Sequence, residues 1–145
     1  MSITDPRTAY AAMTTALIES FRAHGGEVTD GPFKDRPVLL LTTRGARSGE
    51  ERLTPVVYSR DGDDLVIVAS KGGAPTNPGW YHNLIANPVA TVEVGPERFQ
   101  VRAEAVQGAE RDRLYAAHGA VFPGFLAYQE RTSRVIPVLR LHRII

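Results

Sequence analysis

The residues of this 145-residue chain that could do chemistry gather in two short segments that contain glycine. The first, residues 42–52 (TTRGARSGEER), brings three arginines, two threonines, a serine and two glycines into an expected loop between strands. Glycines let backbone N–H groups turn inward as an anion-binding nest, and Arg47, Ser48 and Arg52 can donate hydrogen bonds to phosphate or carboxylate oxygens. The alternative is a solvated hairpin loop in which the two glutamates neutralise the arginines.

The second segment, residues 69–84, places a cation and paired glycines ahead of an aromatic run. Its residues 70–73 (SKGG) precede a helix that we expect to begin at Pro78, with Asn77 as its cap. A flat ligand could approach the backbone closely at the glycines, and the helix N-terminus would offer N–H groups to an anionic substituent. In the alternative interpretation, Trp80 only fastens this helix to the rest of the domain.

Composition and spacing exclude several other chemistries. The chain has no cysteine, which excludes a thiolate nucleophile, a disulfide framework and cysteine-ligated metals. Its four histidines stand far apart, so no metal site is predicted. Residues 45–49 (GARSG) lack both the ending of a phosphate loop and the serine position of a nucleophile elbow. A net charge of +1 gives no bulk field for binding nucleic acid or an anionic membrane.

An N-terminal helix is expected from Pro6 to about His24, because Tyr10, Met13, Leu17 and Phe21 recur on one helical face. This stripe should pack on the rest of the domain, with peripheral membrane contact as the alternative. No window approaches the ~20 apolar residues that a membrane span needs. We therefore expect a cytoplasmic protein that is membrane-associated at most at the periphery.

The remaining pattern predicts about six strands, joined mostly by tight turns. They are expected at residues 38–43, 52–60, 65–70, 89–94, 98–106 and 135–141. Pro55 should make the second an edge or bulged strand, residues 30–32 should form a turn, and helices are expected at 109–119 and about 123–131. Hairpin connections favour an antiparallel sheet that closes into a small barrel. The predicted fold class is α+β, with one domain over residues 1–145.

Four blocks of sequence, taken in order, resemble the deazaflavin-dependent nitroreductase family of actinobacteria, small split β-barrel proteins that use coenzyme F420. The blocks are LTTRGARSG (41–49) with Arg52 and Pro55, VASKGGA (68–74), NPGWYHNL (77–84) with ANP (86–88), and RVIPV (134–138). The resemblance implies an antiparallel split barrel like those that bind FMN. Its cofactor-binding core would span residues 37–138, preceded by the N-terminal helix within residues 1–26.

The resemblance also implies where coenzyme F420, an 8-hydroxy-5-deazaflavin, would lie. The phosphate and acidic tail would be held by Ala46, Arg47, Ser48, Arg52, Leu53 and Thr54. The ring and polyol would be flanked by Val68, Ala69, Ser70, Lys71, Gly79, Trp80, Tyr81, His82, Asn83 and Phe125. Because a deazaflavin delivers a hydride, the protein need only bind, orient and shield it, which agrees with the lack of a catalytic triad.

In this family the C-terminal helical segment closes the substrate pocket, and some relatives carry several tyrosines there. This chain has Phe122, Phe125 and Tyr128 over the corresponding stretch, so two hydroxyls are missing. A pocket that hydrogen-bonds a nitro group discriminates strongly against such a loss, which weakens the case for nitroimidazole activation. Tyr128, with Ser70 as the fallback, is the expected catalytic donor of a proton or hydrogen bond to the acceptor.

The sequence thus predicts an oxidoreductase that transfers a hydride from reduced F420 to a planar electron-poor acceptor. A quinone is the expected partner, with nitroaromatics as incidental substrates. The alternative enzyme is an FMN-dependent split-barrel oxidoreductase, since related barrels accommodate several phosphate-bearing ring cofactors. The alternative from another class is a noncatalytic carrier that only holds the deazaflavin.

Overall fold

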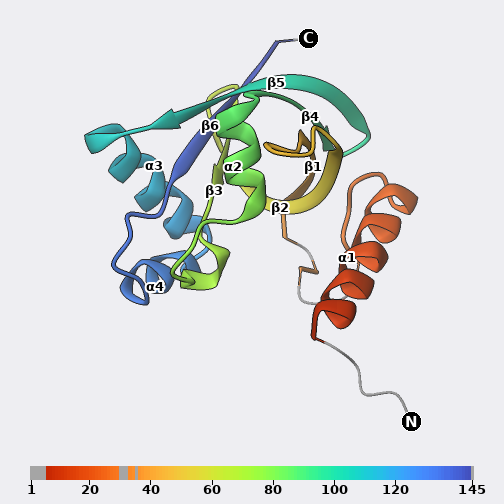
Figure 1. Cartoon of the computed structure of the whole chain (residues 1–145), viewed down its shortest axis with the longest axis horizontal. Coiled ribbons are helices and arrows are strands. Elements are labelled where there is room, and N and C mark those ends of the chain that lie inside the picture. The colour runs from red at the N-terminus through yellow and green to blue at the C-terminus, as the bar shows by residue number, and fades with distance from the viewer. Residues whose placement is uncertain (1–5, 30–32, 35, 145) are drawn as a thin grey trace.

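A six-stranded antiparallel barrel forms the centre of the computed structural model, which describes residues 6–29, 33–34 and 36–144 (Figure 1). The strands are β1 (Val38–Arg44), β2 (Glu51–Asp61), β3 (Asp64–Val68), β4 (Val89–Val94), β5 (Glu97–Val106) and β6 (Val138–Arg143). They close in the order β1-β2-β3-β6-β5-β4. The predicted α+β class and antiparallel barrel are therefore confirmed, while the turn expected at residues 30–32 lies outside the described residues.

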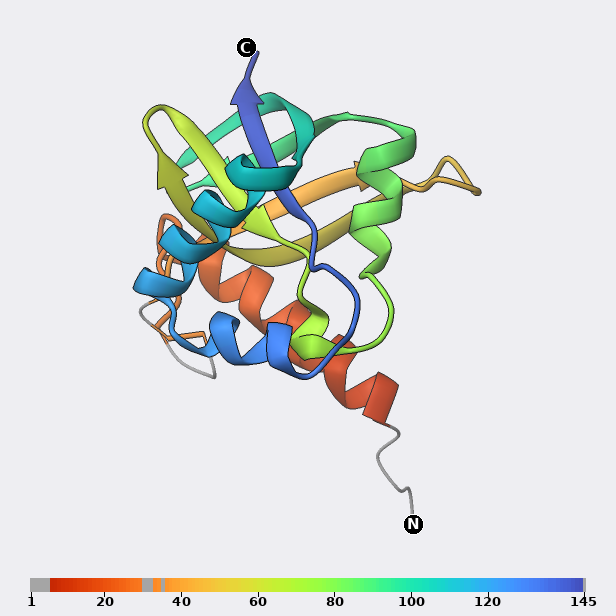
Figure 2. The ribbon, with the colours of Figure 1, turned by 90° about the vertical axis from the view of Figure 1, so that its left-hand side faces the viewer.

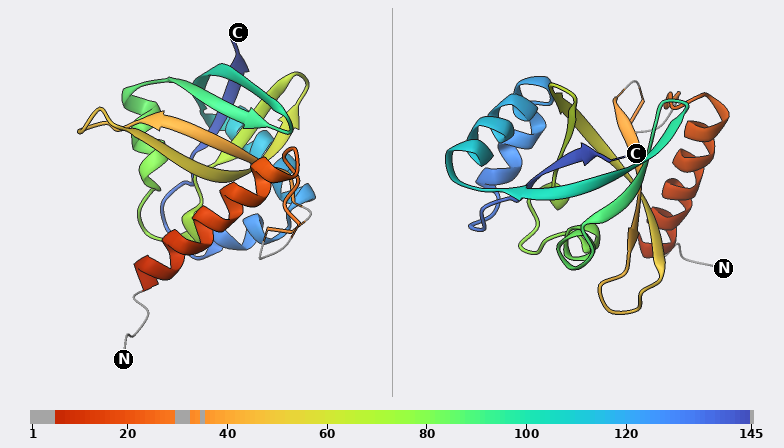
Figure 3. Two further views of the ribbon diagram at one scale, coloured as in Figure 1. Left: turned by 90° about the vertical axis from the view of Figure 1, so that its right-hand side faces the viewer. Right: turned by 90° about the horizontal axis from the view of Figure 1, so that it is seen from above.

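Four helices surround the barrel, and each lies where the pattern predicted one. They are α1 (Pro6–Ala23), α2 (Gly79–Ala86), α3 (Gly108–Val121) and α4 (Gly124–Glu130). Helices α3 and α4 cover one side of the barrel, whereas α1 crosses another side (Figures 2 and 3). A short 3-10 turn, η1 (Lys71–Gly73), forms within the glycine-containing segment that was expected to be a loop.

The second strand changes its partner halfway along its length. Residues 51–57 pair with β1, in a register that sets Pro55 opposite Leu40, whereas residues 58–61 pair with β3. Proline cannot donate to a ladder, and Pro55 lies in the half that is paired on one side only. The prediction of an edge strand at Pro55 thus holds for this half of β2, where the barrel wall opens.

The barrel interior is filled by apolar side chains from all six strands and from α2. The fully buried members include Leu39, Leu41, Ile67, Val92, Val101 and Leu139. Leu84 of α2 packs into the same cluster at 1% exposure, so this helix is fastened to the barrel core. The helix that presents Gly79 to Asn83 therefore has a fixed position relative to the strands.

Helix α1 packs against the outside of the barrel through Leu17 and Phe21 of its predicted stripe, whereas the side chain of Tyr10 lies outside the described part of the chain. Leu17 and Phe21 join a buried cluster with residues of β1, β2 and the α3–α4 corner, whereas Met13 is exposed. The end of α1 touches the β4–β5 turn so closely that a Cβ at Gly26 would lie 2.3 Å from the Cα of Gly95. None of the helices in the described part of the chain is both long and apolar enough to cross a bilayer.

Several element boundaries differ from the predictions. The third strand ends at Val68 rather than at residue 70, the last strand begins at Val138 rather than at residue 135, and α2 begins at Gly79 rather than at Pro78. The Asn77 side chain, expected as the helix cap, instead accepts a hydrogen bond from Arg134. The Ala69 N–H donates to the Pro137 carbonyl one position beyond the Val68–Val138 pair, but Pro137 has no N–H with which to continue the ladder. A long-range hydrogen bond thus replaces the cap, and a proline limits the start of the last strand.

A fully buried histidine lies where α3 meets β2. The Nδ1 atom of His118 is 2.7 Å from the Ser59 hydroxyl, and its Nε2 has no hydrogen-bond partner among the described residues. Phe122 and Phe125 pack against its ring with centroid distances of 5.1 and 4.5 Å. Burial lowers the pKa of His118 to about 4, because a charged imidazolium would lose its hydration there.

His118 should make stability depend on pH. An unfolded histidine titrates near 6.5, so below that pH the unfolded chain binds a proton that the folded chain excludes until about pH 4. The contribution of neutral His118 to the free energy of unfolding is fully present above pH 6.5. It decreases as the pH falls and is lost once the pH has passed through 4, with a total loss of up to about 3 kcal/mol. Denaturant unfolding at several pH values should show this slope in the wild type and in His24→Gln, an exposed control, but not in His118→Leu. An equal slope in His118→Leu would contradict the assignment.

Candidate functional site

A groove runs beside residues 51–57 of β2, the part that pairs with β1, and it consists of two adjoining hollows. The larger hollow, of about 820 Å³, lies between β2, the end of β3, the start of α2 and α4. The smaller, of about 550 Å³, lies between the β1–β2 loop and α2. Arg52, Gly79 and Asn83 line both hollows. These three residues therefore mark the boundary between two connected compartments.

The structure brings most of the predicted site residues together in this groove. Those on the larger hollow are Arg52, Thr54, Val68, Ser70, Lys71, Gly79, Trp80, Asn83, Phe125 and Tyr128. Those on the smaller are Ala46, Arg47, Ser48 and His82, together with the three shared residues. Two segments far apart in sequence thus form one surface, as the four blocks of sequence implied.

Three predicted residues do not line either hollow. Leu53 packs toward the α1 cluster, Ala69 is fully buried in the barrel interior, and Tyr81 packs against that interior from α2. Successive side chains of a strand point to opposite faces, so a run of neighbours cannot all reach one groove. These three residues support the groove from behind.

The loop between β1 and β2 is organised by its own hydrogen bonds. The Gly45 N–H donates to the Glu50 carbonyl at 2.7 Å, and the Gly49 N–H donates to the Gly45 carbonyl at 3.0 Å. The Glu50 N–H donates to the Ser48 hydroxyl oxygen at 3.1 Å. Because Ser48 accepts in this contact, its hydroxyl proton remains available to an anion in the smaller hollow.

Asn83 of α2 ties this loop to the barrel. Its amide oxygen accepts from the Ala46 N–H at 3.0 Å, and its amide nitrogen donates to the buried Thr43 hydroxyl at 3.1 Å. The Ala46 N–H is therefore already satisfied and cannot serve in the anion nest that the glycines suggested. Asn83 instead sets the distance between the loop and α2, and with it the width of the smaller hollow.

The charges of the loop are only partly neutralised within the chain. Arg52 forms an ion pair with Glu50 at 3.2 Å, as the solvated-hairpin alternative expected, with side chains 58% and 68% exposed. Exposed pairs of this kind contribute about 0–1 kcal/mol, so an anion in the hollow can compete for the arginine. Arg47 and Ser48 are exposed on the same hollow. The loop thus remains basic toward a ligand.

The wall that carries Ser70 has an unusual backbone. Ser70 is 7% exposed and faces the larger hollow, and Lys71 after it adopts a left-handed conformation with φ of +47°. Among the described residues Lys71 is the one non-glycine residue with positive φ. Such a conformation costs of order 1 kcal/mol and persists only where the surrounding structure holds it.

The neighbouring wall is built from the α3–α4 corner. Phe125 packs edge-on against His118 at 4.5 Å and against Tyr128 at 5.3 Å. The Tyr115 hydroxyl donates to the Phe125 carbonyl. Phe122, by contrast, is buried toward α1 and does not line the groove. Of Phe122, Phe125 and Tyr128, therefore, only Phe125 and Tyr128 face the larger hollow.

Sequence reasoning missed several residues of the larger hollow. They are Phe33, Pro55, Val56, Val57 and Pro78. An aromatic residue within a polar turn was a usable signal for Phe33. The β2 residues could not be assigned without knowing where the strand loses its second partner.

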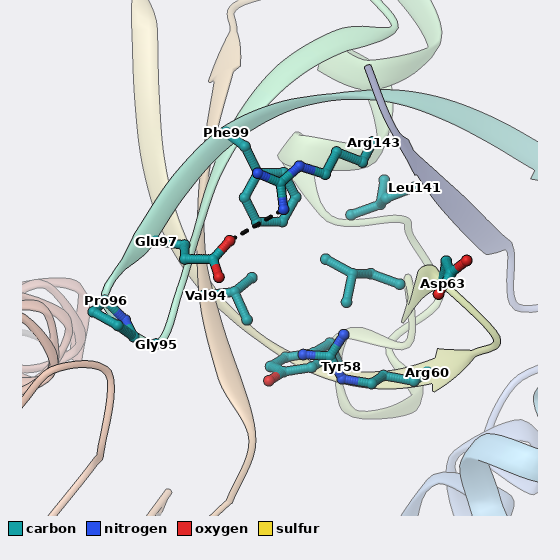
Figure 4. Close-up of a pocket in the computed structure, with 11 residues that line it drawn as sticks. Tyr58, Arg60, Asp63, Val94, Gly95, Pro96, Glu97, Phe99, Leu141 and Arg143 are labelled. Atoms are coloured by element: carbon teal, nitrogen blue, oxygen red, sulfur yellow. Dashed lines mark hydrogen bonds and ion pairs between the residues drawn. The ribbon is translucent and has the colours of Figure 1, made fainter. Parts of the chain in front are cut away.

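A separate hollow of about 390 Å³ opens at the barrel end formed by the β2–β3 and β4–β5 turns (Figure 4). Arg143 lies over the Phe99 ring at 4.2 Å and pairs with Glu97 at 3.1 Å, while Arg60 lies over Tyr58 at 5.6 Å. None of the predicted site residues lines it. The rim side chains are exposed and satisfy one another, so the groove remains the candidate site.

The chain is similar in sequence to one protein family and in fold to several solved structures. A family model described as F420H(2)-dependent quinone reductase matches residues 14–142. An F420H(2)-dependent quinone reductase of Mycobacterium tuberculosis is 50% identical over 110 residues, which cover 74% of each chain. A solved structure of an F420-H2 dependent reductase (FDR-A) is 36% identical, with a TM-score of 0.68 over 74% of this chain and 95% of that one. A haem storage protein from Vibrio cholerae, 16% identical with a TM-score of 0.59 over 88% of each chain, shares the fold alone.

Proposed function

This chain belongs to the F420H(2)-dependent quinone reductase family, and we propose that it passes a hydride from reduced F420 to a quinone within the groove. It is an oxidoreductase whose cofactor is coenzyme F420 and whose acceptor class is the quinones. One observation supports this location for the reaction. A hollow with apolar walls adjoins a basic hollow, and Arg52, Gly79 and Asn83 line both.

The residues of the groove fit the two chemically different parts of the coenzyme. Val68, Trp80 and Phe125 give the larger hollow flat and apolar walls, which suit a tricyclic ring. Arg47 and Ser48 of the smaller hollow suit phosphate and carboxylate groups. Between them, a Cβ built at Gly79 would meet no atom within 4 Å, so the passage that joins the hollows is clear.

Reduced F420, when bound, supplies a hydride, and a quinone that accepts it also needs one proton on oxygen to become the hydroquinone. Tyr128 and Ser70 both line the larger hollow and each carries a hydroxyl. We assign Tyr128 as the donor to the acceptor oxygen, with Ser70 as the second donor. The remaining contribution of the chain is to orient the ring and to exclude water.

Nitroaromatics are incidental acceptors in this proposal, because the groove presents Phe125 where some relatives carry a tyrosine. A cytoplasmic location stays a prediction, as does peripheral membrane contact by α1.

Steady-state turnover tests the proposed function directly. Purified protein should oxidise reduced F420 with menadione, followed by the recovery of F420 absorbance, whereas a noncatalytic carrier would bind the coenzyme without turnover. Soaking the protein with FMN provides the comparison, since an FMN enzyme would retain flavin and not F420. Absence of F420 binding with tight FMN binding would overturn the proposal.

Arg47 and Arg52 should bind the anionic end of the coenzyme. Replacing either with alanine should weaken F420 binding by about 1.5–3 kcal/mol per lost charge-assisted contact, and the effect should shrink at high salt. Titration of F420 fluorescence measures this. Arg60→Ala, which removes an exposed arginine from the far end of the same strand, is the matched control. If both variants fold and bind F420 with unchanged affinity at low salt, the β1–β2 loop is only a solvated hairpin loop and does not bind the coenzyme.

Tyr128 should act on the acceptor and not on the coenzyme. Tyr128→Phe keeps the ring and removes the hydroxyl, so F420 affinity should survive while kcat/KM for menadione falls about tenfold to a hundredfold. Ser70→Ala should deepen the loss when the two changes are combined. Tyr58→Phe, at the other barrel end, controls for loss of a tyrosine hydroxyl. Full turnover by the double variant would mean that solvent supplies the proton.

A further inference from the structure

Arg134, in the segment between α4 and β6, directs its side chain into the loop that carries Ser70. Its Nε donates to the Ala74 carbonyl at 2.8 Å, and its Nη2 donates to the Ser70 carbonyl at 2.7 Å. Its Nη1 donates to the Ala69 carbonyl at 3.1 Å and to the Asn77 side-chain oxygen at 2.7 Å. One guanidinium thus holds residues 69–77 from behind the groove.

This arginine is held without a carboxylate. Burial lowers the pKa of Arg134, and none of the described acidic residues stabilises its charge. The positive charge is balanced by carbonyl and amide dipoles of one loop, which is a demanding arrangement because a partly buried charge needs its hydrogen bonds satisfied. A role limited to surface charge would not require four acceptors from a single loop.

The backbone of Arg134 is tied in turn to α4. Its carbonyl accepts from the Gln129 side-chain nitrogen at 2.7 Å. The Gln129 oxygen accepts from the Ile136 N–H at 3.0 Å and from Arg111 of α3 at 2.7 Å. Gln129 directly follows Tyr128 in α4, so a single chain of hydrogen bonds joins the Tyr128 wall of the groove to the Ser70 wall.

Residues 70–73, which Arg134 holds, have a backbone conformation that is unfavourable by itself. Lys71 has a φ of +47°, which a lysine rarely adopts. Gly73 approaches α4 so closely that a Cβ there would lie 2.8 Å from the Tyr128 carbonyl oxygen. The conformation of residues 70–73 therefore depends on contacts from outside the loop, and the Arg134 hydrogen bonds are the main polar ones.

We propose that Arg134 is the positioning residue of the groove, which keeps the Ser70–Lys71 wall at a fixed distance from the Tyr128 wall. It acts through the loop and touches neither coenzyme nor quinone. The proposal rests on the proposed function for its effect on F420, but its effect on the loop is independent of any ligand. Lysine cannot replace it, because one ammonium cannot reach four acceptors that are spread around a planar fork.

The test compares Arg134→Lys and Arg134→Ala with the wild type at a temperature well below unfolding. Hydrogen exchange without ligand should speed up at the amides of residues 70–77, while the barrel strands keep their protection. The F420 dissociation constant, from fluorescence titration, should rise at least about tenfold in both variants. Methylguanidinium added to Arg134→Ala should restore much of the affinity and protection, because it replaces the missing fork.

Arg140→Lys is the matched control. Arg140 is also a partly buried arginine with several hydrogen bonds, but its partners Asp61 and Glu110 lie away from the groove. This variant should lose stability without a change in F420 affinity. If Arg134→Lys keeps wild-type affinity and loop protection, the proposal is wrong; should Arg134→Ala fail to fold, Arg134→Lys alone decides. If the wild type itself does not bind F420, the proposed function fails, while the exchange result still decides the positioning role.

Discussion

The groove depends on the change of partner along β2. A closed barrel of six strands has an interior filled by side chains and leaves no room for a tricyclic ring. Here residues 51–57 pair with β1 only, so the wall opens between them and the end of β3. Pro55 lies on this open edge, where its missing N–H leaves no donor unsatisfied. The same opening lets the loop after β3 and the start of α2 face Thr54 and Val56 across one hollow.

The chain then separates polar from apolar chemistry along this opening. Arginines lie at the end beyond Gly79, where the β1–β2 loop is exposed and an anionic tail keeps part of its hydration. The other end is lined by aromatic and aliphatic side chains, where a neutral ring is better accommodated than a charge. Asn83 belongs to both ends, because its hydrogen bonds to Ala46 and Thr43 fasten the polar loop to the helix that bears Trp80. The two ends therefore favour the proposed orientation, with an anionic tail toward Arg47 and Ser48 and a flat ring toward Trp80 and Phe125.

The local patterns of the sequence were sufficient for the elements but not for their boundaries or their contacts. The six expected strands and the expected helix from Pro6 to about His24 rest on patterns of neighbouring residues, and the structure contains each of these elements. The family resemblance assigned Leu53, Ala69 and Tyr81 to the cofactor site, yet the structure turns Leu53 and Ala69 away from the groove and packs Tyr81 against the barrel interior. The Arg134 contacts join residues 57 to 65 positions apart, and no periodicity encodes a pairing of that kind. Such a contact explains the missing Asn77 cap.

The groove has no acid–base dyad among its described residues, which agrees with the hydride transfer proposed for it. A hydride donor brings its own reactive electron pair, so the protein lowers the barrier by holding donor and acceptor at reacting distance and by keeping water out. For the proposed reaction, the walls of the groove must keep a constant separation while the coenzyme and the quinone are bound. The walls here come from segments with no strand pairing between them, since α4 and residues 69–77 meet through close packing at Gly73 and through Arg134 and Gln129. Other enzymes need a rigid structure to align a catalytic triad. In the arrangement proposed for this protein, the hydrogen bonds of Arg134 and Gln129 behind the groove keep its walls in place.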